Sequence, residues 1–141
     1  MNQYGAKAYH KTSVATASKE KVLLMLYEGC IRNLRKCKIA MENKNWAEKG
    51  IHLGKAQDIV NELSNSLNFE VGGDLAKQLE ALYLHVFQET TKANIENDPA
   101  KIAHCIKVME TLYEGWKEAV EKLKTGEKKR RNSTSFWKIR T

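Results

Sequence analysis

The sequence lacks several features that would each indicate a particular class of protein. Its 141 residues contain no apolar run near the roughly 18 residues that a membrane-spanning helix needs. The first residues, MNQYGAKAYHK, include no hydrophobic segment and therefore no secretory signal. The three cysteines are odd in number and form no CxxC pair, which argues against a disulfide framework or a zinc knuckle. These absences predict a protein of the reducing cytoplasm, without membrane insertion.

Motifs for catalysis are also missing. A di-iron bundle would need Glu-x-x-His pairs on facing helices, but no glutamate stands three positions before His52, His85 or His104. Gly72-Gly73 has neither the preceding strand nor the following Gly-Lys-Ser/Thr of a phosphate-binding loop. We therefore expect a protein that is not an enzyme, with no cofactor and no metal, and with its histidines at the surface or the edge of the core.

What the sequence does contain is helical periodicity, first in residues 16–41. The apolar positions of this segment are spaced 4, 3, 4, 3 and 4 residues apart, which is one face of a helix with 3.6 residues per turn. They are Leu23, Tyr27, Cys30, Leu34, Cys37 and Met41. Thr16 and Ser18 can cap the first turn. A helix with one apolar face needs partners of similar length.

Two further segments with the same periodicity follow. Asn45 and Glu48 are spaced as a capping box, so the second helix should open at Trp46. Its predicted core face is Trp46, Leu53, Ala56, Val60, Leu63 and Leu67. The paired glycines Gly72-Gly73 predict a sharp reversal, after which Asp74 should cap the third helix. The predicted core face of that helix is Leu75, Leu79, Leu82, Val86 and Ala93.

The fourth segment starts at the only proline. Asp98 can cap a helix that has Pro99 at its first position, and Gly126 should end it. Its predicted core face is Ile102, Cys105, Met109, Leu112, Trp116, Ala119 and Leu123. Four long helices joined by short turns predict an all-α fold, an antiparallel up-down four-helix bundle over residues 16–126. Residues 1–15 are expected to form a flexible N-terminal segment, and residues 127–141 a basic, disordered tail.

Two of these helices carry more apolar residues than one core needs. The second adds Ile51 and Ile59, and the third adds Tyr83, Leu84, Phe87 and Ile95. One interpretation places them half-buried at the border of the core. The other is a groove between the second and third helices that accepts an amphipathic helix from a partner. Composition does not choose between the two.

The net charge of +7 is concentrated in the tail. Residues 127–141 contain six basic residues and one acidic residue, so +5 lies there and only +2 on residues 1–126. A nucleic-acid binder usually shows its excess charge on the folded surface, so nucleic-acid binding is not favoured. It remains as an alternative in which the tail binds nucleic acid, with Phe136 and Trp137 as stacking residues.

Several motifs in a fixed order resemble the flagellar secretion chaperone FliS family. They are TAS…LLMLYEG, KAQDIVNELSNSLN, VGGDLAKQLEALY, AN…D and GWKEAV, and together they span roughly residues 14–120. The resemblance implies a cytoplasmic helical-bundle chaperone that binds the C-terminal segment of flagellin and prevents its premature polymerisation. It also implies delivery of that client to the export gate of the flagellar type III apparatus. An adaptor of the same fold for another amphipathic client is the alternative.

The resemblance also suggests which residues bind the client. The matching positions are Lys55, Ala56, Gln57, Ile59, Leu63, Leu67, Leu82, Tyr83, Asn94 and Trp116, and Phe87 joins them as an extra apolar residue of the third helix. Tyr9 and Val14 approximate the N-terminal residues that, in the family, can cover part of the client surface. The tail, KKRRNSTSFWKIRT, departs from the family pattern.

Overall fold

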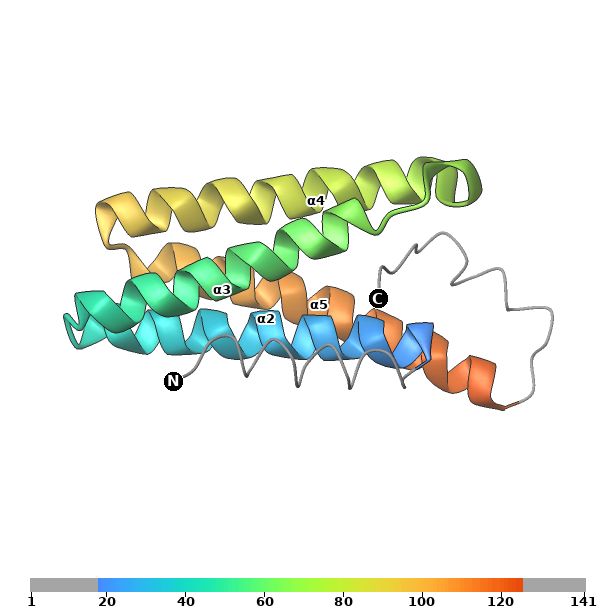
Figure 1. The fold of residues 1–141 in the computed structure, drawn as a ribbon, viewed down its shortest axis with the longest axis horizontal. Coiled ribbons are helices and arrows are strands. Elements are labelled where there is room, and N and C mark those ends of the chain that lie inside the picture. The colour runs from blue at the N-terminus through green and yellow to red at the C-terminus, as the bar shows by residue number, and fades with distance from the viewer. Residues whose placement is uncertain (1–17, 126–141) are drawn as a thin grey trace.

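The computed structural model describes residues 18–125, which form four helices and no strand. The helices are α2 (Lys19–Glu42), α3 (Trp46–Asn65), α4 (Phe69–Glu96) and α5 (Pro99–Lys124) (Figure 1). The all-α prediction is confirmed. None of these four helices is long and apolar enough to cross a membrane. The predicted N-terminal segment, with Tyr9 and Val14, and the predicted tail lie outside the described residues.

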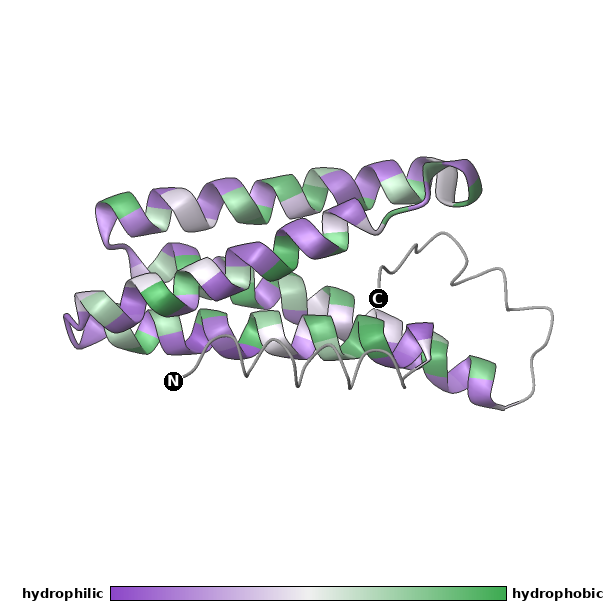
Figure 2. Ribbon diagram, viewed as in Figure 1, coloured by the Kyte–Doolittle hydropathy of each residue, from purple (hydrophilic) through white to green (hydrophobic). Residues whose placement is uncertain are grey.

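The four helices pack as an antiparallel bundle. Both α2 and α4 pack against α3 and against α5, so α2 and α4 occupy opposite corners. Successive helices run in opposite directions, and α3 crosses obliquely from the side of α2 to the side of α4 (Figure 1). Figure 2 shows hydrophobic and hydrophilic residues recurring along every helix, as amphipathic helices require.

Side chains cap the start of each helix, mostly as predicted. The side chain of Ser18 accepts a hydrogen bond from the Lys21 amide at 3.1 Å, and Asn45 Oδ1 accepts one from the Glu48 amide at 3.3 Å. Asp98 Oδ1 accepts from the Ala100 amide at 3.0 Å, directly before the proline in the first turn of α5. These caps satisfy amides that have no partner within the helix.

The start of α4 differs from the prediction. This helix begins at Phe69 rather than after the paired glycines, and its cap is Asn68, whose side chain accepts from the Glu70 and Val71 amides. The expected role of Asp74 as N-cap was therefore wrong. The sharp change of direction does occur, but inside α4, where Gly73 has φ 50° and ψ −126°. A residue with a Cβ atom rarely adopts this conformation.

The core follows the predicted face of α2 closely. All six predicted residues of α2 are buried, and so are Leu53, Ala56, Val60, Leu63 and Leu67 of the second segment. Trp46, in contrast, is exposed. On α5, Ile102, Cys105 and Met109 are buried, whereas the four later residues of the predicted face are half-buried.

The core face of α4 is rotated relative to the prediction. Leu79, Val86 and Ala93 are buried as expected, but Leu75 and Leu82 are exposed. The neighbouring positions Ala76 and Tyr83 are buried in their place. Tyr83 can enter the core because its hydroxyl lies 2.5 Å from that of Tyr27 on α2. Burial raises the pKa of both phenols, so both stay protonated.

Candidate functional site

The candidate site is a groove between α3 and α4 with a volume of about 530 Å³. Its lining residues come from one edge of each helix and are Val60, Asn61, Ser64, Lys77, Glu80, Ala81, Tyr83, Leu84 and Phe87. Val60 and Tyr83 are buried core residues, whereas Leu84 is 55% exposed. The groove therefore has an apolar floor, an exposed leucine and polar side chains from both helices.

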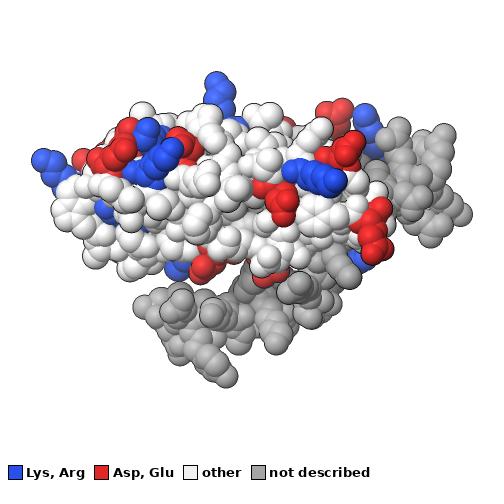
Figure 3. All heavy atoms as spheres, turned by 90° about the horizontal axis from the view of Figure 1, so that it is seen from above, with Lys and Arg blue, Asp and Glu red and all other residues white. Residues whose placement is uncertain are grey.

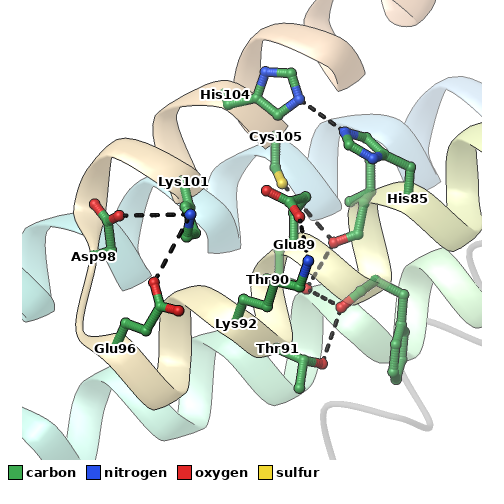
Figure 4. Close-up of polar contacts among 12 residues, drawn as sticks. His85, Glu89, Thr90, Thr91, Lys92, Glu96, Asp98, Lys101, His104 and Cys105 are labelled. Carbon is green, nitrogen blue, oxygen red and sulfur yellow. Dashed lines mark hydrogen bonds and ion pairs between the residues drawn. The ribbon is translucent and has the colours of Figure 1, made fainter.

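One polar cluster fastens α3 to α4 next to this groove. Gln57 Nε2 donates to the hydroxyls of Thr90 and Thr91 at 2.9 and 3.0 Å. Both hydroxyls also donate to the Phe87 carbonyl oxygen at 2.9 Å, and Figure 4 shows both side chains directed at that oxygen. Thr90 and Thr91 therefore link Gln57 to the backbone of α4, which fixes the spacing of the two helices beside Phe87.

Exposed apolar side chains of α4 lie at the rim of the groove and further along the same helix. Leu84 and Ile95, three turns apart on the same edge, are 55% and 76% exposed, whereas Leu82, 36% exposed, lies on the opposite edge towards α5. Figure 3 views this side of the bundle, where uncharged side chains cover much of the surface and charged ones stand in separate groups. Exposed leucine and isoleucine beside an apolar groove are typical of a surface that binds another apolar segment.

A second hollow, of about 660 Å³, lies between α2 and α5 and has a different character. It is lined mainly by charged residues, and an ion pair between Arg35 and Glu110 crosses it. The Tyr113 hydroxyl donates to Glu28 Oε2 at 2.5 Å, and this hydrogen bond is the main reason why the pKa of Tyr113 rises to about 12. A hollow lined by paired charges is a poor binding site for an apolar segment, because burying those charges costs free energy.

The predicted client-binding residues do not form one patch. Gln57, Tyr83 and Phe87 lie together at the α3–α4 groove. Ile59 lies on the opposite edge of α3, towards α2, with its Cδ1 only 3.3 Å from where a Cβ on Gly29 would stand. Trp116 lies on α5 and donates from Nε1 to the Tyr27 hydroxyl at 3.3 Å.

Accessibility also separates the predicted residues. Leu63, Leu67 and Tyr83 are buried in the core, together with Ala56. Lys55 and Leu82 are exposed, whereas Gln57, Ile59, Phe87, Asn94 and Trp116 are half-buried. The carbonyl oxygen of Asn94 accepts a hydrogen bond from Lys49 Nζ at 3.3 Å. Their roles in client binding stay predictions.

Sequence reasoning missed the small and polar residues of the groove. These are Asn61 and Ser64 on α3 and Lys77, Glu80 and Ala81 on α4. A signal was available, because on each helix these positions are three or four residues from one another or from Val60, Leu84 and Phe87, along a single edge. Hydropathy alone could not reveal them.

Comparisons with known proteins agree on one family. The sequence profile described as "Flagellar protein FliS" matches residues 1–123. Among curated proteins, the flagellar secretion chaperone FliS of Vibrio cholerae serotype O1 is 39% identical over 114 residues, covering 78% of this chain and 84% of the relative. The protein of the same name from Bacillus subtilis is 33% identical, covering 81% of this chain and 84% of the relative. These relatives are named as chaperones and not as enzymes, which agrees with the prediction.

A solved structure supports the fold independently. The crystal structure described as a flagellar chaperone from bacteria superimposes with a TM-score of 0.70, covering 86% of this chain and 99% of that one. Its sequence identity is 22%, so this likeness bears on the fold alone.

Proposed function

The chain belongs to the FliS family of flagellar secretion chaperones, and from this premise we propose that it binds the C-terminal segment of flagellin in the cytoplasm. Binding would prevent premature polymerisation of flagellin and help to deliver it to the export gate of the flagellar type III apparatus. The observation that carries the proposal is the apolar groove between α3 and α4 with exposed Leu84 at its rim and Ile95 further along the same edge of α4.

The groove suits a client that becomes helical on binding. An amphipathic helix buries its apolar face in such a groove through side chains spaced three and four residues apart. A segment that is disordered when free loses on the order of 2–5 kcal/mol of the gross interaction energy to ordering. Affinity must then come from apolar contacts that exclude water, which Leu84 and Phe87 can supply.

The proposal is tested by placing a charge at the rim of the groove. Leu84→Asp should weaken binding of a flagellin C-terminal peptide by about tenfold or more, because it puts a carboxylate into a desolvated contact. Leu84 is already 55% exposed, so the fold should tolerate the change. Ile59→Asp is less informative, because Ile59 packs against the core and next to Gly29. Binding is measured by isothermal titration calorimetry.

Ile39→Asp is the matched control, since Ile39 is an apolar residue of α2 with almost the same exposure, 56%. It should leave the peptide affinity unchanged. If both variants bind the peptide as well as the unmodified chain does, the α3–α4 groove is not the client site. If the unmodified chain does not bind flagellin peptide, but binds another amphipathic segment through Leu84, the fold serves a different client.

A further inference from the structure

Two histidines from different helices meet on the α4–α5 side of the bundle. The Nε2 atoms of His85 on α4 and His104 on α5 are 2.9 Å apart. Their rings are almost perpendicular, at 87°, with centroids 5.1 Å apart, and both residues are exposed (Figure 4). The groove proposed for the client lies on the other edge of α4, so this pair is a separate feature.

The chemistry of the pair suits a metal ion. In the neutral state one Nε2 must carry a proton and donate it to the lone pair of the other. When the donating ring carries its proton on Nδ1 instead, the Nε2 lone pairs of both rings point into the space between them. Metal–nitrogen bonds of about 2.0–2.1 Å place two ligands of a tetrahedral ion about 3.3 Å apart. A small rotation of two exposed rings is enough to reach this separation from 2.9 Å.

Charges of both signs lie within one turn of the pair, including the exposed Lys107 after His104. Lys101 lies one turn before His104, but its Nζ is directed at Glu96 and Asp98, at 3.8 and 3.9 Å (Figure 4). Glu89 lies one turn after His85 on α4 and adds negative charge, although it pairs with Lys92 at 3.5 Å.

We propose that His85 and His104 together bind a divalent transition-metal ion such as Zn²⁺ or Ni²⁺, with water completing its coordination. Imidazole is a preferred ligand for both ions. No group of three or more metal-binding side chains occurs within residues 18–125, so the site has two protein ligands and remains open. Open coordination implies weaker binding than a closed structural zinc site gives.

Cys105 does not belong to this site although it adjoins His104 in sequence. Its Sγ points into the bundle, 3.8 Å from the Val86 carbonyl oxygen (Figure 4). Burial raises the pKa of the Cys105 thiol to about 12, so the thiolate that a metal needs is not formed near neutral pH.

A metal held by one histidine from each helix would link α4 to α5. Because the ion binds the folded arrangement and not the unfolded chain with two separated histidines, it should stabilise the fold. The test uses the full chain, without an affinity tag and under reducing conditions, titrated with ZnCl₂ at pH 7.5. We expect His85→Asn and His104→Asn each to lower Zn²⁺ affinity at least tenfold and to abolish the rise in thermal midpoint that Zn²⁺ produces.

Two other histidines provide controls. His52 lies on α3 with its Nδ1 2.9 Å from Asn33 Oδ1 and its Nε2 3.1 Å from Glu48, so His52→Asn should leave Zn²⁺ binding unchanged. His10→Asn, outside the described residues, should also leave it unchanged. In the unmodified chain, Zn²⁺ should shift the NMR ring signals of His85 and His104 together.

The proposal is overturned if neither His85→Asn nor His104→Asn changes Zn²⁺ affinity, or if His52→Asn or His10→Asn causes the loss instead. It is equally overturned if the ring signals of the pair do not respond to Zn²⁺ in the unmodified chain. In each of these cases the pair is an interhelical hydrogen bond only.

Discussion

At the scale of single residues, a buried polar contact joins three helices of the bundle. The hydroxyls of Tyr27 on α2 and Tyr83 on α4 are 2.5 Å apart, and Trp116 Nε1 on α5 donates to the Tyr27 hydroxyl at 3.3 Å. Tyr27 and Tyr83 are both among the most buried side chains of the molecule. Their hydroxyls satisfy each other, which allows two large aromatic residues to occupy opposite corners of the core.

Removing the central hydroxyl should therefore be costly. Tyr27→Phe removes a fully buried hydroxyl that contacts both Tyr83 and Trp116, and we expect a loss of about 1–3 kcal/mol in the free energy of unfolding. Urea denaturation monitored by circular dichroism measures it. Tyr113→Phe is the matched control, because it removes a hydroxyl whose bond to Glu28 is exposed, and it should change the stability by less than about 0.5 kcal/mol. Equal effects of both substitutions would show that the buried contact contributes no more than a surface one.

At the scale of the helices, the sequence predicted the capping side chains of three helices and the core face of α2, because each depends on local chemistry. Ser18, Asn45 and Asp98 act through amides two or three residues away. The core face of α4 could not be predicted in the same way, because Leu82 and Tyr83 are adjacent and both apolar. The choice between them depends on the Tyr27 hydroxyl, which comes from another helix.

The candidate site was predictable to a similar extent. Of the six extra apolar residues of the second and third helices, only Tyr83, Leu84 and Phe87 line the α3–α4 groove, and their role in client binding stays a prediction. Ile59 was placed with them because it is apolar and off the core stripe, yet its edge of α3 faces α2. Hydropathy gives the width of an apolar face, but which neighbouring helix lies beside each edge is a property of the bundle.

The bend at the start of α4 gives a prediction for a single glycine. Gly73 has φ 50° and ψ −126°, which a residue with a Cβ atom adopts only under strain. Gly73→Ala should therefore lower the free energy of unfolding by about 1–3 kcal/mol, although nothing lies within 4 Å of the added Cβ. Thermal and urea unfolding measure it.

Gly54→Ala provides the control for Gly73→Ala. Gly54 is exposed in the interior of α3, and the space around its Cβ position is equally open. Alanine has the higher helix propensity, so this substitution should stabilise the protein by about 0.4–1 kcal/mol. If the two substitutions change the free energy of unfolding with opposite signs, the difference comes from backbone conformation, because both sites have equally open space. A stabilising Gly73→Ala would instead mean that the first turn of α4 can straighten into a continuous helix.

At the scale of the whole molecule, most of the net charge belongs to one end of the sequence, whereas the core cluster of the described residues lies earlier in the chain. The hydrophobic core cluster of the described residues extends from Val22 to Met109 and involves all four helices. Residues 127–141, which lie outside the described residues, carry +5 of the net charge of +7. Folding and client binding are therefore expected to depend on the bundle. Any salt-dependent binding of polyanions is expected to depend on the basic end of the sequence.

Ending the chain after Gly126 tests this separation. We expect the thermal midpoint and the affinity for a flagellin C-terminal peptide to remain essentially unchanged, because the groove and the core cluster are formed by residues that the truncation retains. Leu34→Ala shows that the assay can detect a real loss: Leu34 is fully buried, and its truncation should lower the free energy of unfolding by about 2–5 kcal/mol. A clear fall in thermal midpoint on truncation would mean that residues 127–141 pack on the bundle, and tighter peptide binding would mean that they compete for the groove.

If the full chain binds RNA with a steep salt dependence that the truncated chain loses, the nucleic-acid alternative is favoured, since each neutralised phosphate contributes to that slope.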